Sequence, residues 1–130
     1  MDKREVKIDY VVYKNSYPPE YELLCRKAVE VLPNAYSIYS GFSVGAAVWL
    51  ENGEILTGTN QENAAYPSGM CAERTVLYYA GALYPEVAIK ALAVAGANKG
   101  QQTEEFVPPC GACRQVMMEM TVSYTHLRAH

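Results

Sequence analysis

Two short cysteine-bearing segments constrain the fold of this chain more than any other feature of its sequence. The first, "CAER", begins at Cys71, and the second, "PPCGACRQ", contains Cys110 and Cys113. Each opens a stretch with helical character, "CAERTVLYYAGALYP" and "CGACRQVMMEM". The N-terminus of a helix presents unpaired N–H groups and the positive end of the helix dipole, which favour the thiolate form of cysteine. The sequence therefore predicts two helices whose first turns carry metal-binding or reactive thiols.

Composition indicates one globular domain and limits the roles of these thiols. The chain has 130 residues, of which 50% are hydrophobic and 19% are charged, enough for one core. We see neither an apolar run of the ~20 residues that span a bilayer nor a signal peptide in the charged start "MDKREVKIDY". We therefore expect a cytoplasmic protein with reduced thiols. A net charge of −3 offers no basic field, so we expect a small-molecule ligand and no nucleic-acid or membrane partner.

The hydrophobic pattern predicts a mixture of helices and strands. Residues 6–12 alternate in the manner of a half-buried strand, and residues 18–35 have helical spacing. Residues 42–60 contain two apolar runs around Asn52-Gly53, the strongest short signal for a β-hairpin. Residues 87–97 are typical of a buried strand. The combination predicts an α/β fold.

The thiols of the two predicted helices suit a zinc ion. Cys110 and Cys113, three residues apart, face one point from a first helical turn, and Cys71 supplies a third sulfur. A tetrahedral zinc with three protein ligands keeps one position open for water, whose pKa then falls to about 7. Glu73 lies two residues after Cys71, and a carboxylate beside such a water is suited to carry protons. The pattern therefore predicts a catalytic zinc site rather than a structural one.

Longer strings around these residues resemble the small cytidine deaminases. "YSGFSVGAAV", "NQENAAYPSGMCAERT" and "PCGACRQV" are similar to the all-cysteine form of this zinc nucleoside deaminase family over about residues 36 to 120. The resemblance implies a three-layer α/β/α fold with a mixed sheet. It implies hydrolytic deamination of cytidine or deoxycytidine to uridine or deoxyuridine and ammonia, with Zn2+ as the only cofactor. It also implies a role in pyrimidine salvage and a homotetramer.

Within this resemblance the metal-binding and catalytic residues match one by one. Cys71, Cys110 and Cys113 match the three zinc ligands. Glu73 matches the catalytic proton shuttle, although a glutamate in a first helical turn also suits the helix dipole. Arg74 matches an arginine that hydrogen-bonds the zinc thiolates, the alternative being a solvated helix arginine. Three thiolates leave a divalent ion with a net charge of about −1, which weakens its acidity unless hydrogen-bond donors withdraw charge.

The substrate-binding residues of the family match a second group. Asn60 and Glu62 match the pair that holds the ribose 3′-hydroxyl, to which an amide and a carboxylate together donate and accept. Asn60 could instead end a turn. Phe42 matches the ring that stacks on the pyrimidine, whereas an aromatic residue beside a core strand is often only packed. We interpret Gln115 and Tyr66 as supporting or interface residues.

Alternative interpretations stay open at this point. Cys25 as a fourth thiolate would make the site structural, but it lies on the apolar stripe of the first predicted helix, where we expect a core cysteine. A redox pair of Cys110 and Cys113 would leave Cys71 without a role. The substrate could be another free aminopyrimidine, such as a blasticidin-type antibiotic or a nucleotide. The chain could also be a zinc-stabilised module without catalysis.

Residues 121–130, "TVSYTHLRAH", depart from the family pattern. We therefore expect a deaminase domain over residues 1–120 that is incomplete at its C-terminal end, with the last strands of the sheet missing, and a non-family tail over 121–130. His126 and His130 receive no catalytic role. Without those strands the strand predicted at residues 87–97 has an open apolar edge. We expect this edge to lower solubility, activity and tetramer formation relative to a chain with the usual family ending.

Overall fold

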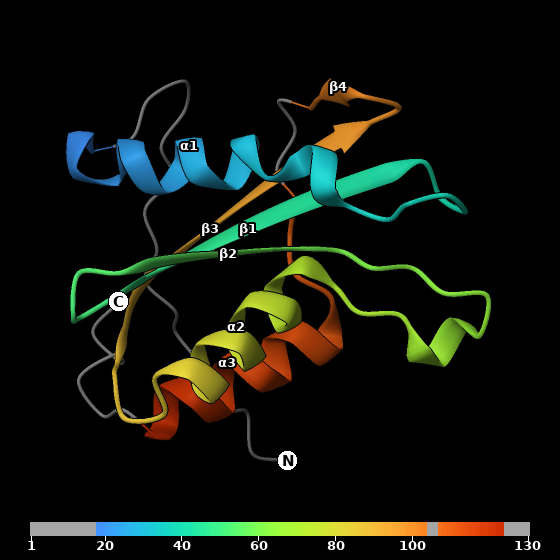
Figure 1. Ribbon diagram of the computed structural model, residues 1–130. Coiled ribbons are helices and arrows are strands. Elements are labelled where there is room, and N and C mark those ends of the chain that lie inside the picture. Colours follow the sequence, from blue (N-terminus) through green and yellow to red (C-terminus); the bar gives the residue numbers. More distant parts are fainter. Residues whose placement is uncertain (1–17, 104–106, 124–130) are drawn as a thin grey trace, which may run out of the picture.

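The computed structural model describes residues 18–103 and 107–123, with side chains to residue 120, and arranges them in three layers (Figure 1). A four-stranded sheet has the strand order β2-β1-β3-β4. Helix α1 (Glu22–Glu30) covers one face, and helices α2 (Ala72–Leu83) and α3 (Gly111–Ser123) cover the other. The predicted α/β class and its three layers are confirmed.

The sheet is built around a hairpin and one long ladder. Its strands are β1 (Phe42–Leu50), β2 (Ile55–Thr59), β3 (Ile89–Asn98) and β4 (Gln101–Gln102). The hairpin turns at Asn52-Gly53 as predicted, with Gly53 at a φ of 92° and the Asn52 side chain accepting from the backbone N–H of Glu54 at 3.0 Å. Glycine adopts this left-handed conformation without a steric penalty, so the turn residue matches the geometry.

Every strand pairing in the described sheet is antiparallel. β3 pairs with β1 from Asn98 to Ile89, whereas β4 meets β3 only at Ala97 and Asn98. Parallel pairing, which a mixed sheet requires, is limited among the described residues to the isolated bridge between Tyr36 and Gln61. The strand predicted at residues 6–12 lies outside the described residues, as do His126 and His130.

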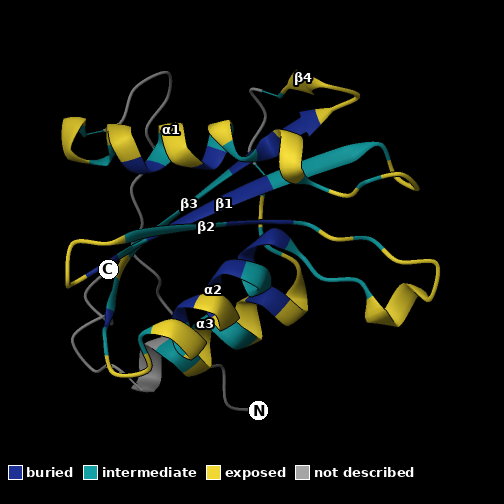
Figure 2. Ribbon diagram, viewed as in Figure 1, coloured by how far each residue is buried: buried dark blue, intermediate teal, exposed yellow. Residues whose placement is uncertain are grey.

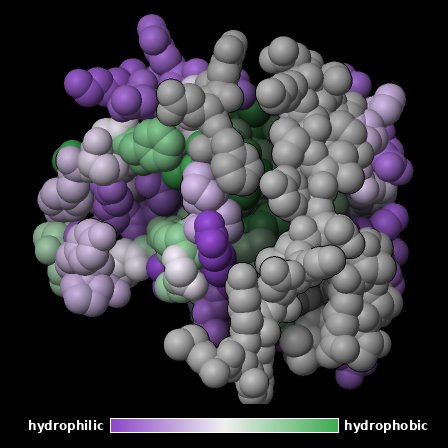
Figure 3. All heavy atoms as spheres, turned by 180° about the vertical axis from the view of Figure 1, so that it is seen from behind, coloured by the Kyte–Doolittle hydropathy of each residue, from purple (hydrophilic) through white to green (hydrophobic). Residues whose placement is uncertain are grey.

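Alternation along β1 divides the core between the two faces of the sheet. Ala46, Val48 and Leu50 point toward α2, whereas Ala47 points toward α1. Figure 2 shows buried residues concentrated in the central strands and on the helix sides that face them. Figure 3, which views the molecule from behind, shows hydrophobic side chains between the helical layers near the middle of the face, with hydrophilic ones beside them and at the edges. Because successive side chains of β1 point to opposite faces of the sheet, each helical layer packs against its own set of apolar side chains.

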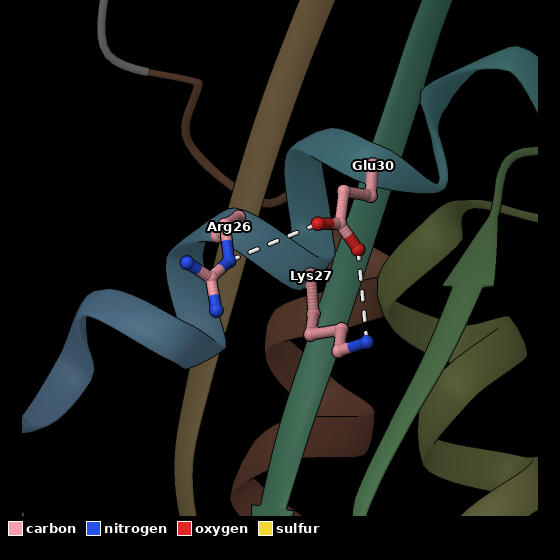
Figure 4. A network of polar contacts seen from close by, with 3 residues as sticks. All are labelled: Arg26, Lys27 and Glu30. Atoms are coloured by element: carbon pink, nitrogen blue, oxygen red, sulfur yellow. Dashed lines mark ion pairs between the residues drawn. The ribbon is translucent and has the colours of Figure 1, made fainter.

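The outer face of α1 carries charged side chains rather than a packing surface. Arg26 and Lys27 both contact the carboxylate of Glu30, at 3.7 Å and 3.6 Å (Figure 4). About half of each side chain is exposed, so these ion pairs add little to stability. In the part of the chain that the structure describes, no helix has the length and apolar character needed to cross a membrane.

A glycine lets α2 approach β2 closely. A Cβ atom at Gly58 would lie 2.8 Å from the backbone nitrogen of Val76 and 3.2 Å from the carbonyl oxygen of Ala72. These atoms belong to the backbone of α2 and cannot swing aside. The absence of a side chain at Gly58 therefore sets how near the first half of α2 lies to the sheet.

We predict that Gly58→Ala lowers the free energy of unfolding by about 1–3 kcal/mol, because the added methyl group forces α2 away from β2. Gly81→Ala is the matched control, since the nearest atom to its Cβ is a methionine methyl at 4.0 Å. Replacing a helical glycine with alanine should raise the free energy of unfolding by about 0.5–1 kcal/mol. Urea unfolding measures both, and equal stability of the two variants would contradict the prediction.

Candidate metal centre and active site

Cys71 is the residue that caps the N-terminus of α2. Its backbone is extended, with φ −73° and ψ 154°. The carbonyl of Cys71 accepts hydrogen bonds from the backbone N–H and the hydroxyl of Thr75, both at 3.0 Å. The thiol makes no hydrogen bond of its own to cap the helix. The backbone thus begins the helix, and the sulfur stays available for other partners.

Cys110 occupies the corresponding place before α3. Its carbonyl accepts the backbone N–H of Arg114 at 2.9 Å, and its sulfur accepts the backbone N–H of Cys113 at 3.4 Å. Helices α2 and α3 lie side by side and begin at the same end (Figure 1). Both helices therefore direct their first turns toward one point, as the sequence predicts.

The three sulfur atoms converge at this point. Those of Cys71, Cys110 and Cys113 all lie within 4.8 Å of one another. The sulfur of Cys110 is 3.7 Å from that of Cys71 and 3.3 Å from that of Cys113. Tetrahedral zinc with bonds of about 2.3 Å separates its sulfur ligands by about 3.8 Å. The separation of Cys71 and Cys110 matches this value, and that of Cys110 and Cys113 is about 0.5 Å shorter, so the cluster has dimensions suited to zinc.

The two thiols of α3 differ in environment. Cys110 is exposed, and the backbone N–H of Cys113 that donates to its sulfur lowers its pKa. Burial raises the pKa of the Cys113 thiol to about 12, with a further contribution from the sulfur of Cys110. Because zinc binds the thiolate, its binding displaces a proton from Cys113 at neutral pH. Zinc affinity therefore increases as the pH rises.

Arg74 is a cation in direct contact with the cluster. Its Nη2 donates to the sulfur of Cys71 at 3.5 Å, and hydrogen bonds to Cys71 and then Cys113 raise its pKa above the ordinary value. The Nε atom of Arg74 is buried and has no hydrogen-bond partner among the described residues. The guanidinium thus lies beside the thiols as the resemblance implies, and it withdraws negative charge from sulfur.

A pocket of about 700 Å³ opens next to the thiols. Its wall is formed by the turn at Tyr39 and Ser40, most of the segment from residue 60 to residue 71, Arg74 and Cys110. Cys71 and Cys110 reach the wall, whereas Cys113 is fully buried and does not line it. A small molecule in this pocket would therefore meet the metal centre from the side of Cys71 and Cys110.

Asn60 and Glu62 both line the pocket, and both also hold backbone groups. The amide of Asn60 accepts the N–H of Val44 at 2.8 Å and donates to the carbonyl of Phe42 at 2.9 Å. Oε1 of Glu62 accepts the N–H groups of Tyr39 at 2.9 Å and Ser40 at 3.1 Å. The sequence interpretation missed this second role, which depends on contacts between distant segments.

Two other predicted residues do not line the pocket. The ring of Phe42 lies over Gly96 of β3, where an added Cβ would come within 2.8 Å of Cζ. Glu73 is only 4% exposed in the first turn of α2. Of the supporting residues, Tyr66 lines the pocket and is 91% exposed, and Gln115 is exposed on α3.

Cys25 belongs to a different part of the molecule. It is half-buried on α1, on the face of the sheet opposite α2 and α3 (Figure 1). The group of potential metal ligands in the described residues contains the other three cysteines without it. A fourth thiolate from Cys25 is therefore excluded by the sheet that lies between them.

Known protein families and structures share the sequence and fold of this chain over most of its length. The family model for the cytidine and deoxycytidylate deaminase zinc-binding region matches residues 18–127. A cytidine deaminase of Halalkalibacterium halodurans is 42% identical over 99 residues, which cover 76% of this chain and 70% of that protein. One from Sporosarcina psychrophila is 41% identical over 114 residues, covering 84% and 79%. The crystal structure of cytidine deaminase from Burkholderia pseudomallei superposes with a TM-score of 0.67 at 42% identity, covering 77% and 76%.

We predict that Cys110→Ala releases zinc, because two thiolates remain where three are needed to hold the ion. Since metal binding and folding are coupled, the variant should also melt at a lower temperature. Cys25→Ala is the matched control and should keep the zinc content of the unaltered chain. Metal analysis of the purified proteins measures the difference, and unchanged zinc in Cys110→Ala would refute the three-thiolate site.

Proposed function

The chain belongs to the family defined by the cytidine and deoxycytidylate deaminase zinc-binding region, and from this premise we propose how its residues carry out the reaction. The activity is the zinc-dependent hydrolytic deamination of cytidine or deoxycytidine to uridine or deoxyuridine and ammonia. The observation that carries this function is the convergence of three sulfur atoms within 4.8 Å beside a pocket. A blasticidin-type substrate and a non-catalytic zinc module are not favoured by the comparisons.

Cys71, Cys110 and Cys113 are proposed to hold the zinc ion. When bound, zinc supplies the Lewis acidity that makes water a nucleophile at neutral pH. Arg74 stabilises the thiolates through its hydrogen bond to Cys71. The three thiolates repel one another. The positive charge of Arg74 offsets part of this repulsion and so lowers the free-energy cost of bringing them together.

Glu73 is proposed to move the protons of the reaction. It takes one proton from the attacking water and delivers it to N3 of the pyrimidine, and a second proton leaves with the departing amine as ammonia. Its support is its position, since it lies in the first turn of α2 two residues after Cys71, and its charge contributes to the raised pKa of Cys113.

We predict that Glu73→Gln retains zinc but loses about 10²–10⁴ of the deamination rate, because the amide cannot carry the proton. Glu22→Gln is the control, since Glu22 is also a first-turn glutamate but lies on α1. It should leave the rate unchanged. The loss of cytidine absorbance and zinc per chain are measured on both variants, and loss of zinc from Glu73→Gln would argue against the division of roles.

The sugar is proposed to bind at Asn60 and Glu62, with the pyrimidine directed toward the thiols. Both side chains line the pocket that also contains Cys71 and Cys110. The only lysine or arginine among the described pocket-lining residues is Arg74, whose guanidinium already donates to sulfur. A 5′-phosphate therefore finds no free cation there, which favours a nucleoside over a nucleotide. Phe42 is proposed as the ring that stacks on the pyrimidine, which requires it to move from its place over Gly96.

We predict that Glu62→Ala lowers kcat/KM for cytidine by about tenfold to a hundredfold, because a sugar hydroxyl loses its charged acceptor. Free cytosine has no ribose, so its kcat/KM should fall much less. Steady-state assays with both substrates measure the difference. Equal losses would mean that Glu62 supports the fold and does not bind the sugar.

Exposed side chains near the pocket bear on assembly, and the thiols bear on the cellular role. The aromatic and aliphatic side chains of Ile38, Tyr39 and Tyr66 are 69%, 61% and 91% exposed near the pocket, which suits contact with neighbouring subunits of a homotetramer. The reduced thiols of a zinc site suit the cytoplasm, and the deamination of a free nucleoside suits a role in pyrimidine salvage. We also propose a division into a deaminase domain at residues 1–120 and a tail at residues 121–130. Helix α3 extends across this boundary to Ser123.

A further inference from the structure

Gln61 lies between the two residues of the proposed sugar site and is paired through the backbone on both sides. Its N–H and its carbonyl exchange hydrogen bonds with the backbone of Met70, both at 2.8 Å. On the other side, Tyr36 donates its N–H to the carbonyl of Asn60 at 3.0 Å and accepts the N–H of Glu62 at 2.8 Å. The segment that carries the sugar pair is therefore the middle of a ladder of three segments, called here the three-segment ladder.

One edge of the three-segment ladder leads directly to the metal centre. Met70 is the residue before Cys71, whose sulfur belongs to the cluster of three thiols. The backbone bonds between Gln61 and Met70 thus join the sugar segment to a proposed zinc ligand. Any displacement of the ladder would change the separation of the sugar pair and the thiols, and a nucleoside held between them reacts only if that separation is correct.

The side chain of Gln61 fixes the three-segment ladder to the turn that follows α1. Its Nε2 donates to the carbonyl of Asn34 at 3.2 Å and to Oγ1 of Thr59 at 2.9 Å. The hydroxyl of Thr59 donates in turn to the same carbonyl of Asn34 at 3.3 Å. Because a carbonyl oxygen can only accept, the amide must present its NH₂ group at this point. Asn34 ends the 3-10 turn Leu32–Asn34, in which Leu32 is buried, so the anchor belongs to the core.

The two anchoring contacts differ in their environment. Gln61 is exposed and lines the pocket, whereas Thr59 is only 5% exposed. The amide thus reaches from the wall of the pocket to a buried hydroxyl. A buried acceptor that loses its donor costs more free energy than an exposed one, which can accept from water instead. The hydrogen bond to Thr59 is therefore the stronger of the two.

We propose that Gln61 is a positioning residue, whose side chain holds the three-segment ladder and thereby keeps Asn60 and Glu62 at the correct separation from Cys71. The inference rests on the proposed function, since it names a residue that acts through the sugar pair. Thr59 does not line the pocket. A change at Thr59 therefore reports on the anchor alone, which separates positioning from a direct contact between Gln61 and the substrate.

Gln101 offers a matched control for the loss of a glutamine. It is exposed on β4 and is not among the residues that line the pocket. Gln101→Met makes the same replacement as Gln61→Met without touching Asn34 or Thr59. In both variants the side chain keeps its length and loses its hydrogen-bonding groups.

The kinetic test uses cytidine and 2′,3′-dideoxycytidine, which lacks the 3′-hydroxyl. Gln61→Met should lower kcat/KM for cytidine about threefold to tenfold and that for 2′,3′-dideoxycytidine by less than about twofold. Thr59→Val should act in the same direction, and the double variant should lose little more than the larger single loss, because both changes break one contact. Gln101→Met should alter neither substrate, and zinc per chain should be the same in all variants.

Amide hydrogen exchange tests the anchor without any substrate. In the zinc-loaded, ligand-free protein, the N–H groups of Gln61, Glu62 and Met70 should exchange about threefold to tenfold faster in Gln61→Met than in the unaltered chain. The rates should not change in Gln101→Met. If Gln61→Met does not fold, Gln61→Glu takes its place with the same expected direction, since it keeps the length but places a carboxylate against the carbonyl of Asn34.

Three results would each overturn the role of Gln61: equal losses with both nucleosides, unchanged selectivity in Thr59→Val, or unchanged exchange of the three N–H groups. Unchanged selectivity in Thr59→Val together with a loss in Gln61→Met would mean that Gln61 contacts the sugar directly. If the zinc-loaded unaltered chain converted neither nucleoside, the proposed function would fall. The exchange rates would then decide by themselves whether Gln61 anchors the three-segment ladder.

Discussion

The side-by-side packing of two helix N-termini is the constraint on which the rest of the site depends. α2 lies close to β2 because Gly58 has no side chain there. α3 packs beside α2 with Val116, Met117 and Met120 against the same hydrophobic core. Both first turns are therefore held by rigid elements and not by loops, which keeps a ligand set more precise. The 3.7 Å separation of the Cys71 and Cys110 sulfurs follows from this packing.

Concentrated negative charge is the second property of the site. Three sulfurs and the buried carboxylate of Glu73 lie close together, and the cation that contacts these sulfurs among the described residues is Arg74. Burial of unpaired charge is costly, so the buried thiol of Cys113 favours its protonated form until a cation enters. The raised pKa of Cys113 reflects this balance. A bound divalent ion would therefore offset the electrostatic cost of placing these negative groups together, which the protein alone offsets only in part.

Local sequence patterns predicted the helices, the hairpin and the cysteines of the cluster. The contacts of the predicted substrate-binding residues depend on segments far apart in the chain, and the sequence did not predict them. Asn52-Gly53 encodes its own turn, and a cysteine before a helical stretch encodes the position of a thiol. In contrast, the contacts of Asn60 with β1 and of Glu62 with the turn at Ser40 join segments about twenty residues apart, which no periodic pattern reports. The place of Phe42 over Gly96 depends on the pairing of β1 with β3. A glycine such as Gly96 in a strand indicates that another group packs closely against the backbone there. The sequence alone does not show that this group is the ring of Phe42.

The ladder between β1 and β3 also sets when the thiols meet during folding. It pairs strands separated in the chain by all of β2 and α2, so it forms only after a large loop has closed. Contacts of this kind slow folding relative to hairpins and helices. A chain with its helices formed but this ladder open holds Cys71 and Cys110 apart. We therefore expect tight zinc binding late in folding, once the central sheet is complete.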